Sequence, residues 1–136
     1  MKIKGLDGKE YPWNFTKYNT GRMDCSKLHL QARILLCNLF PYDGIYEEVV
    51  LPGIKHEIVQ RSLIADFYIH APRLIIEVQG EQHYKFVNFF HISRAEYFRA
   101  KKLDSLKHQW CALNEITLVE LPFNQVDNWL DIIRNR

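Results

Sequence analysis

The chain has 136 residues, of which 47% are hydrophobic and 25% are charged, and its formal net charge is +2. This length and composition predict a single globular domain and exclude a largely disordered chain. The net charge is too small to identify a polyanionic partner by itself, and no apolar run approaches the ~20 residues that cross a bilayer. Because the N-terminal stretch MKIKGLDGKEYPWNF also lacks the apolar core of a signal peptide, we expect an intracellular, cytoplasmic protein without a membrane partner.

The cysteines favour free thiols. Cys25, Cys37 and Cys111 are odd in number and have no CxxC spacing, and the last two fall within apolar helical patterns. This usage predicts buried free thiols in a reducing compartment, ahead of disulfides or a zinc site.

Residues 1–25 predict an N-terminal arm in which turn-forming residues alternate with aromatic ones. One interpretation is that the aromatic side chains anchor the arm to the core, and the other is that the arm touches nucleic acid through Lys9, Lys17 and Arg22. Anchoring is favoured, because isolated aromatic residues more often pack than stack on bases. The aromatic residues are Tyr11, Trp13, Phe15 and Tyr18.

Residues 26–136 predict an α/β fold with the element order α-β-β-β-α-β-α, which is typical of a mixed β-sheet flanked by helices. Ser26 is a suitable N-cap for the first helix, and Pro41 stops it. The expected elements are a helix over 26–40, strands over 45–51, 62–70 and 73–79, a helix over 93–113, a strand over 116–121 and a helix over 124–134.

Two acidic residues, Asp66 and Glu77, stand inside apolar strands. If a four-residue loop from His70 to Arg73 joins these strands as a hairpin, Asp66 lies directly opposite Glu77 with Cβ atoms ~5 Å apart. A loop with an odd number of residues would remove this alignment. Two like charges facing each other in a half-buried sheet destabilise it, so something must neutralise them.

A hard divalent cation would neutralise the pair. Mg²⁺ is typically bound by one or two carboxylates together with waters and phosphate oxygens. Gln79 points to the same face as Glu77 and can orient a water molecule. The three residues therefore predict a site for metal-assisted phosphodiester hydrolysis, with Mn²⁺ as a substitute for Mg²⁺. The alternative is that both carboxylates make ordinary salt bridges with Lys55, Arg61 or Arg73.

The hairpin IADFYI…LIIEVQGEQHY, placed between one helix and a second, basic helix, resembles the PD-(D/E)xK nuclease superfamily. Within that superfamily it is most similar to the branch related to very-short-patch-repair endonucleases, and phage homing endonucleases are similar too. The likeness covers roughly residues 26–121. It implies a restriction-endonuclease-like fold and metal-dependent DNA cleavage.

The resemblance assigns roles within the hairpin. Asp66 would be the central metal ligand, Glu77 the second and the Val78 backbone carbonyl a third. Gln79 stands where the family has a lysine, and a neutral amide can donate a hydrogen bond but carries no charge. His83, in the GEQH turn, would touch the scissile phosphate or transfer a proton, unless it is an ordinary turn histidine.

Many family members present a further glutamate from the first helix. The first helix expected here offers only His29 and Gln31 at that place. The resemblance therefore implies that this ligand is missing or comes from Glu47 or Glu48 on the next strand. Glu81, which follows the hairpin, is another accessory candidate.

The long helix over 93–113 is basic. Its cations would hold the DNA backbone over the site, or would form an ordinary solvated helix face. They are Arg94, Arg99, Lys101, Lys102 and Lys107.

Together these features predict a Mg²⁺-dependent DNA endonuclease. A monomer with one site would nick one strand, and cleavage of both strands would require a homodimer. Two alternatives remain, a non-catalytic nucleic-acid-binding module on the same fold and an unrelated α/β interaction protein with structural carboxylates.

Overall fold

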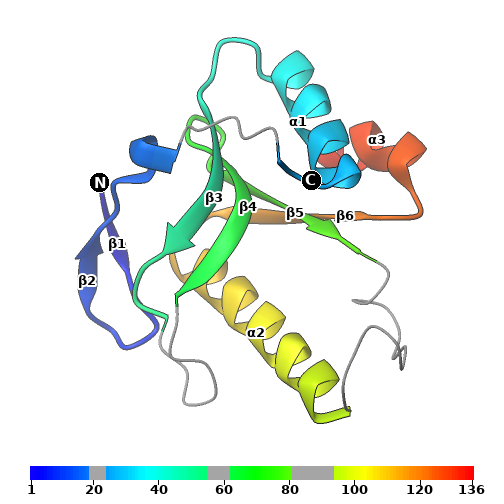
Figure 1. Ribbon diagram of the computed structural model, residues 1–136. Coiled ribbons are helices and arrows are strands. Elements are labelled where there is room, and N and C mark those ends of the chain that lie inside the picture. Colours follow the sequence, from blue (N-terminus) through cyan, green and yellow to red (C-terminus); the bar gives the residue numbers. More distant parts are fainter. Residues whose placement is uncertain (19–23, 55–61, 81–93) are drawn as a thin grey trace.

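The computed structural model describes residues 1–18, 24–54, 62–80 and 94–136 (Figure 1). In this part of the chain a four-stranded mixed sheet, a separate two-stranded sheet and three α-helices form a mixed α/β structure. The elements are β1 (Lys2–Lys4), β2 (Glu10–Pro12), η1 (Phe15–Tyr18), α1 (Lys27–Leu39), β3 (Ile45–Leu51), β4 (Leu63–Ile69), β5 (Leu74–Gln79), α2 (Arg94–Leu113), β6 (Thr117–Pro122), η3 (Val126–Asn128) and α3 (Trp129–Arg134).

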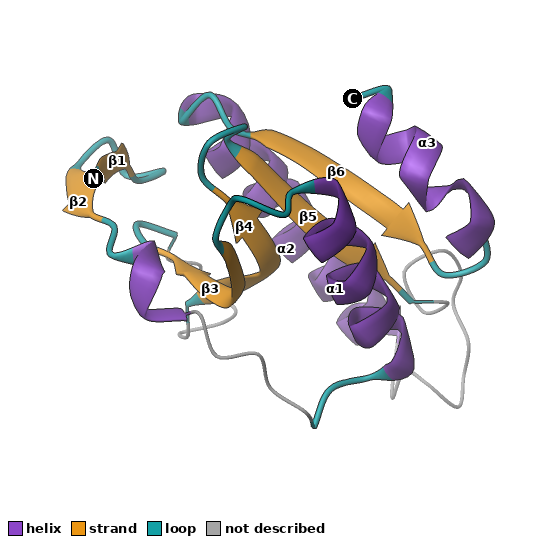
Figure 2. Ribbon diagram, turned by 90° about the horizontal axis from the view of Figure 1, so that it is seen from above, coloured by secondary structure: helices purple, strands orange, loops and turns teal. Residues whose placement is uncertain are grey.

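The main sheet has the strand order β3-β4-β5-β6. Its first two pairings are antiparallel and the pairing of β5 with β6 is parallel. A parallel pair needs a crossover connection, and α2 lies within it. Figures 1 and 2 show α1 and α3 on one face of the sheet and α2 on the other. The mixed sheet and the element order predicted from residue 26 onward are confirmed.

The sheet separates two hydrophobic clusters. One lies under α1 and α3 and includes Leu36, Phe67 and Trp129, all almost fully buried. The other lies between the sheet, α2 and the N-terminal segment and includes Tyr68 and Trp110. Each face of the sheet therefore carries a hydrophobic core, and a buried polar side chain on β4 or β5 must find its partners inside the molecule.

The N-terminal segment contains a hairpin, β1 and β2, that the sequence did not predict. Its strands are only three residues long, too short for a periodic signal. Trp13 is 3% exposed, donates from Nε1 to the Val50 carbonyl at 2.9 Å, and lies 4.5 Å from Tyr68 between ring centroids. Phe15 is also buried. These contacts agree with the interpretation that the aromatic residues anchor the segment.

The helices depart from the predictions in three places. Cys37 is exposed, because it follows Leu36 and is turned about 100° away from the buried face of α1. Phe98 and Leu113 of α2 are also exposed, although in the sequence they lie at helical spacing with the apolar residues Leu106 and Trp110. The last helix is short and begins at Trp129 after a 3₁₀ turn. In the described parts of the chain, no helix is both long and apolar enough to span a membrane.

Candidate functional site

The hairpin of β4 and β5 has the predicted register. Phe67 pairs with Ile76, and Ile69 with Leu74. The chain turns over residues 70–73, where the Arg73 amide donates to the His70 carbonyl at 2.9 Å. This four-residue loop has the even length that the alignment of Asp66 with Glu77 requires.

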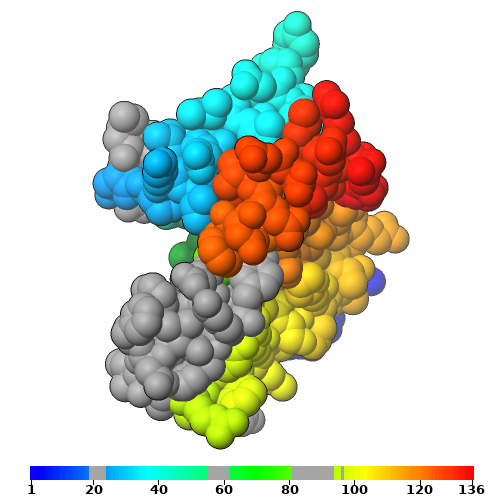
Figure 3. Space-filling view, turned by 90° about the vertical axis from the view of Figure 1, so that its right-hand side faces the viewer, coloured from blue at the N-terminus to red at the C-terminus, as the bar shows by residue number. Residues whose placement is uncertain are grey.

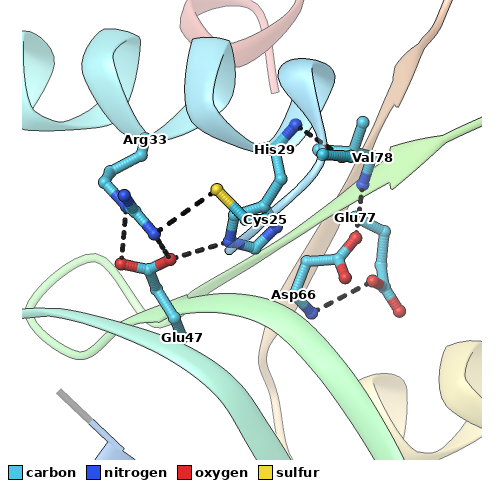
Figure 4. Close-up of polar contacts among 8 residues, drawn as sticks. Cys25, His29, Arg33, Glu47, Asp66, Glu77 and Val78 are labelled. Carbon is cyan, nitrogen blue, oxygen red and sulfur yellow. Dashed lines mark hydrogen bonds and ion pairs between the residues drawn. The ribbon is translucent and has the colours of Figure 1, made fainter. Parts of the chain in front are cut away.

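At Asp66 and Glu77, side chains replace the backbone ladder. The Asp66 amide donates to Glu77 Oε2 at 3.1 Å, and the Val78 amide donates to Asp66 Oδ2 at 2.8 Å (Figure 4). Each carboxylate therefore accepts from the backbone of the opposite strand. The prediction that the two acids meet across the hairpin is confirmed.

A bend in the sheet coincides with this pair. On β3, Glu48 has a φ of 51° and interrupts the pairing with β4 at the position opposite Asp66. Beyond the interruption, alternate side chains of β4 point to the opposite face of the sheet. Phe67 packs under α1, whereas Ala65, two residues earlier, packs with the cluster under α2. Such a local disruption bends a strand and redirects its side chains. Asp66 thus lies where β4 departs from β5.

Glu77 is buried, with 6% of its surface exposed. Its Oε1 lies 2.6 Å from Lys107 Nζ of α2. Burial first, and the negative charge of Asp66 second, raise the pKa of Glu77 to about 7, although Lys107 acts in the opposite direction. The lysine therefore offsets only part of the cost of burying this carboxylate beside another.

The structure places the other predicted hairpin residues as follows. Gln79 is buried on the same face as Glu77, because side chains alternate along a strand. Val78, half-buried, contributes its amide to Asp66 as described above. His83 and Glu81 lie outside the described residues.

The accessory carboxylate Glu47 belongs to a different cluster. It is buried and accepts from Arg33 Nε at 2.9 Å and Nη2 at 2.8 Å, and His29 Nε2 lies 2.7 Å away (Figure 4). Burial would raise the pKa of Glu47, but the hydrogen bonds from Arg33 and His29 outweigh it and lower the pKa. Glu47 faces α1, whereas Glu77 faces α2, so the structure does not bring Glu47 to the candidate site.

Of the remaining accessory candidates, Gln31 is half-buried on α1, which covers the face opposite Lys107. Glu48 is exposed at the bend described above. Neither shares the α2-facing environment of Glu77.

Sequence reasoning missed how α2 meets the sheet. Lys107, predicted as a phosphate contact, forms an ion pair with Glu77 that the sequence did not predict. Glu120 of β6 stands beside Glu77 in the parallel register, and its Oε1 lies 2.6 Å from His108 Nε2. Consecutive α2 residues thus bind neighbouring strands. Their order in the sequence gave no signal, because the rotation of α2 over the sheet is set by packing.

The other four predicted DNA contacts are exposed on α2, which forms part of the outer surface below α1 and α3 in Figure 3. Two lie near aromatic rings. The Arg94 guanidinium is 6.0 Å from the Phe98 ring centroid, and Lys101 Nζ is 5.6 Å from that of Tyr97. The exposed set is Arg94, Arg99, Lys101 and Lys102.

The side chains at this site are of the chemical type that binds a hydrated hard cation such as Mg²⁺. Asp66, Glu77 and Gln79 offer oxygen atoms, which Mg²⁺ prefers, and Mg²⁺ commonly takes one or two carboxylates and fills its remaining positions with water and phosphate. Among the residues that the structure describes, no group of three or more Cys, His, Asp or Glu side chains could hold a metal ion. A site here would therefore depend on water and substrate oxygens.

Comparisons with known proteins place the chain beside uncharacterised viral proteins. No family model and no solved structure matches it. It is 35% identical over 66 residues to the uncharacterised protein 307L of Invertebrate iridescent virus 6, covering 48% of this chain and 34% of that protein. It is 31% identical over 83 residues to the uncharacterised protein 094L of Frog virus 3, covering 60% and 54%. The chain thus spans between about a third and about half of these relatives.

Proposed function

We propose that the protein is a Mg²⁺-dependent DNA endonuclease with a restriction-endonuclease-like fold, of the kind found in phage homing endonucleases. The observation that carries the proposal is the meeting of Asp66 and Glu77 at the bend in β4, on the face where Lys107 lies 2.6 Å from Glu77. The element order from α1 to β6 supports it, since it follows the pattern that the hairpin sequence implies.

Asp66, Glu77 and the Val78 backbone carbonyl would hold the ion. When bound, Mg²⁺ would polarise the scissile phosphate and lower the pKa of a water molecule. Gln79 would orient that water through its amide. Lys107 would supply the positive charge that Gln79 lacks, because it enters the same face from α2.

DNA would be held by the exposed cations of α2. Phosphate contacts fix the position of a duplex without reading its sequence, so these side chains account for affinity and not for target choice. The exposed Arg99 and Lys102 are suited to this role.

Plasmid nicking tests the proposal. The wild-type protein should convert supercoiled plasmid to open circles with Mg²⁺ and lose this activity in EDTA. Asp66→Asn, which keeps an oxygen acceptor for the Val78 amide, should lower the rate by about 100-fold or more. Asp131→Asn is the matched control, because Asp131 is exposed on α3. Equal rates for the wild type and Asp66→Asn would overturn the site.

A non-catalytic nucleic-acid-binding module is the second candidate. Gln79 in place of the family's lysine favours it, as does Lys107 occupying a Glu77 oxygen. This reading predicts that DNA binding persists in EDTA and that no DNA substrate is ever cut. Mg²⁺-dependent nicking by the wild type would exclude it.

A further inference from the structure

We infer that Lys107 and a divalent cation are alternative counter-ions of Glu77, so that the ion binds only when the Lys107 ammonium leaves the carboxylate. This inference rests on the proposed metal site. Lys107 would compete with the metal ion for Glu77. Metal affinity would then depend on a residue that is not itself a metal ligand.

Both oxygens of Glu77 already have partners. Oε1 lies 2.6 Å from Lys107 Nζ, and Oε2 accepts from the Asp66 amide at 3.1 Å. A Mg²⁺ ion binds carboxylate oxygen at about 2.0–2.1 Å. An ion at that distance from Oε1 would compete for the space that the Lys107 ammonium group occupies, and the two positive charges would repel each other.

The charges favour exchange over simultaneous binding. Asp66 and Glu77 carry two formal negative charges when ionised, and Lys107 offsets one of them. A divalent ion would offset both. If Lys107 also stayed in place, the buried site would carry an excess positive charge, which is costly in a poorly solvated environment.

The Lys107 side chain is better placed to move than the Glu77 carboxylate. Its side chain is 19% exposed, compared with 8% for that of Glu77, so the ammonium has a route to solvent. A lysine ammonium sits on a flexible stem, whereas the carboxylate stays tied to the backbone of β4. Once displaced, the ammonium remains beside the site on α2, where a bound phosphate is its natural new partner.

Direct metal titration tests the exchange without relying on cleavage. Mn²⁺ binding, followed by the loss of the free-ion electron paramagnetic resonance signal, is measured for the wild type, Lys107→Met and Lys107→Arg. Lys107→Met should bind Mn²⁺ about tenfold more tightly or better, which corresponds to about 1.4 kcal/mol. Lys107→Arg should bind it no more tightly than the wild type, since arginine keeps the charge.

Lys27→Met is the control, because it removes an exposed cation from α1, away from the site and from the proposed DNA contacts. It should change the affinity less than about twofold, since exposed charges are screened. Metal-induced stabilisation gives a second readout. Lys107→Met should melt below the wild type without metal and gain more in Tm when Mn²⁺ is added. Equal or weaker Mn²⁺ binding by Lys107→Met, or tighter binding by Lys107→Arg, would overturn the inference.

Failure of the exchange and failure of the proposed function look different. If Lys107→Met binds Mn²⁺ more tightly but neither protein nicks DNA, the exchange stands and the endonuclease proposal fails. If the wild type nicks DNA and the affinities are equal, the endonuclease stands and the exchange fails. Absence of Mn²⁺ binding by both proteins overturns both.

Discussion

Two buried glutamates occupy opposite faces of the same sheet, and their environments differ. Glu47 and Glu77 are 5% and 6% exposed. Yet the pKa of Glu47 is lowered, whereas that of Glu77 is raised to about 7. Burial raises the pKa of both groups, and only at Glu47 do the partners outweigh it.

The difference comes from the partners. Glu47 accepts hydrogen bonds from Nε and Nη2 of Arg33 and contacts the ring of His29, and both residues belong to α1 (Figure 4). These partners compensate its negative charge. Glu77 has one lysine and an acidic neighbour, Asp66. A carboxylate with compensated charge is typical of a structural contact, here one that holds α1 against β3. An incompletely compensated one is typical of a site that awaits a ligand.

Removing Arg33 should have the largest effect on stability. Arg33→Ala leaves the Glu47 charge buried without its main partner, which should cost about 3–5 kcal/mol in the free energy of unfolding. Urea denaturation measures this loss. Arg134→Ala is the control, because the Arg134 side chain is exposed on α3. If both variants unfold at the same urea concentration, the compensated cluster does not stabilise the fold.

Glu77→Gln should have the opposite effect. The amide still accepts from the Asp66 backbone but no longer carries the disfavoured charge. At pH 8 the variant should be more stable than the wild type by up to about 3 kcal/mol, the cost of a pKa raised from 4.5 to about 7. A lower Tm for Glu77→Gln than for the wild type at pH 8 would show that Lys107 compensates the charge fully.

The pH dependence of stability has a definite sign. Because the folded state holds a proton on Glu77 more tightly than the unfolded chain does, this group makes stability fall as pH rises from about 4.5 to about 7. The fall should be present in the wild type and absent in Glu77→Gln, as measured by unfolding at pH 5 and pH 8. Parallel pH profiles for the two proteins would contradict the raised pKa.

His29→Ala should have a smaller effect than Arg33→Ala. It removes one hydrogen bond to Glu47 and a ring stacked on Phe67 at 4.4 Å, while both contacts from Arg33 remain. A loss of about 1–2 kcal/mol is expected by thermal unfolding. A loss as large as that of Arg33→Ala would mean that the imidazole, and not the guanidinium, carries the compensation.

The exposed cations of α2 are the reference outside both clusters. The double variant Lys101→Ala, Lys102→Ala should change the free energy of unfolding by less than about 0.5 kcal/mol for each substitution. If both lysines contact phosphates, the slope of log affinity for duplex DNA against log salt should fall by about 2. An unchanged slope would remove these two residues from the proposed DNA contacts.

The sequence predicted the local geometry of the hairpin on one condition, that its loop has an even number of residues. The even loop after Ile69 fixes the register, so Asp66 opposite Glu77 follows from local rules. The partners of each glutamate could not be predicted in the same way. Lys107 reaches Glu77 only because of how α2 packs, and the bend at Glu48 decides which face Glu47 points to. Both depend on tertiary packing, which one sequence does not encode in any local period.

Mg²⁺-dependent plasmid nicking by Glu77→Gln and His29→Ala, measured side by side, tests the distinction between the two faces most directly. We predict that Glu77→Gln is at least as stable as the wild type at pH 8 and does not nick, whereas His29→Ala is less stable and nicks at the wild-type rate at a temperature where it is folded. Wild-type nicking by Glu77→Gln would contradict the assignment of the catalytic site to the α2 face of the sheet.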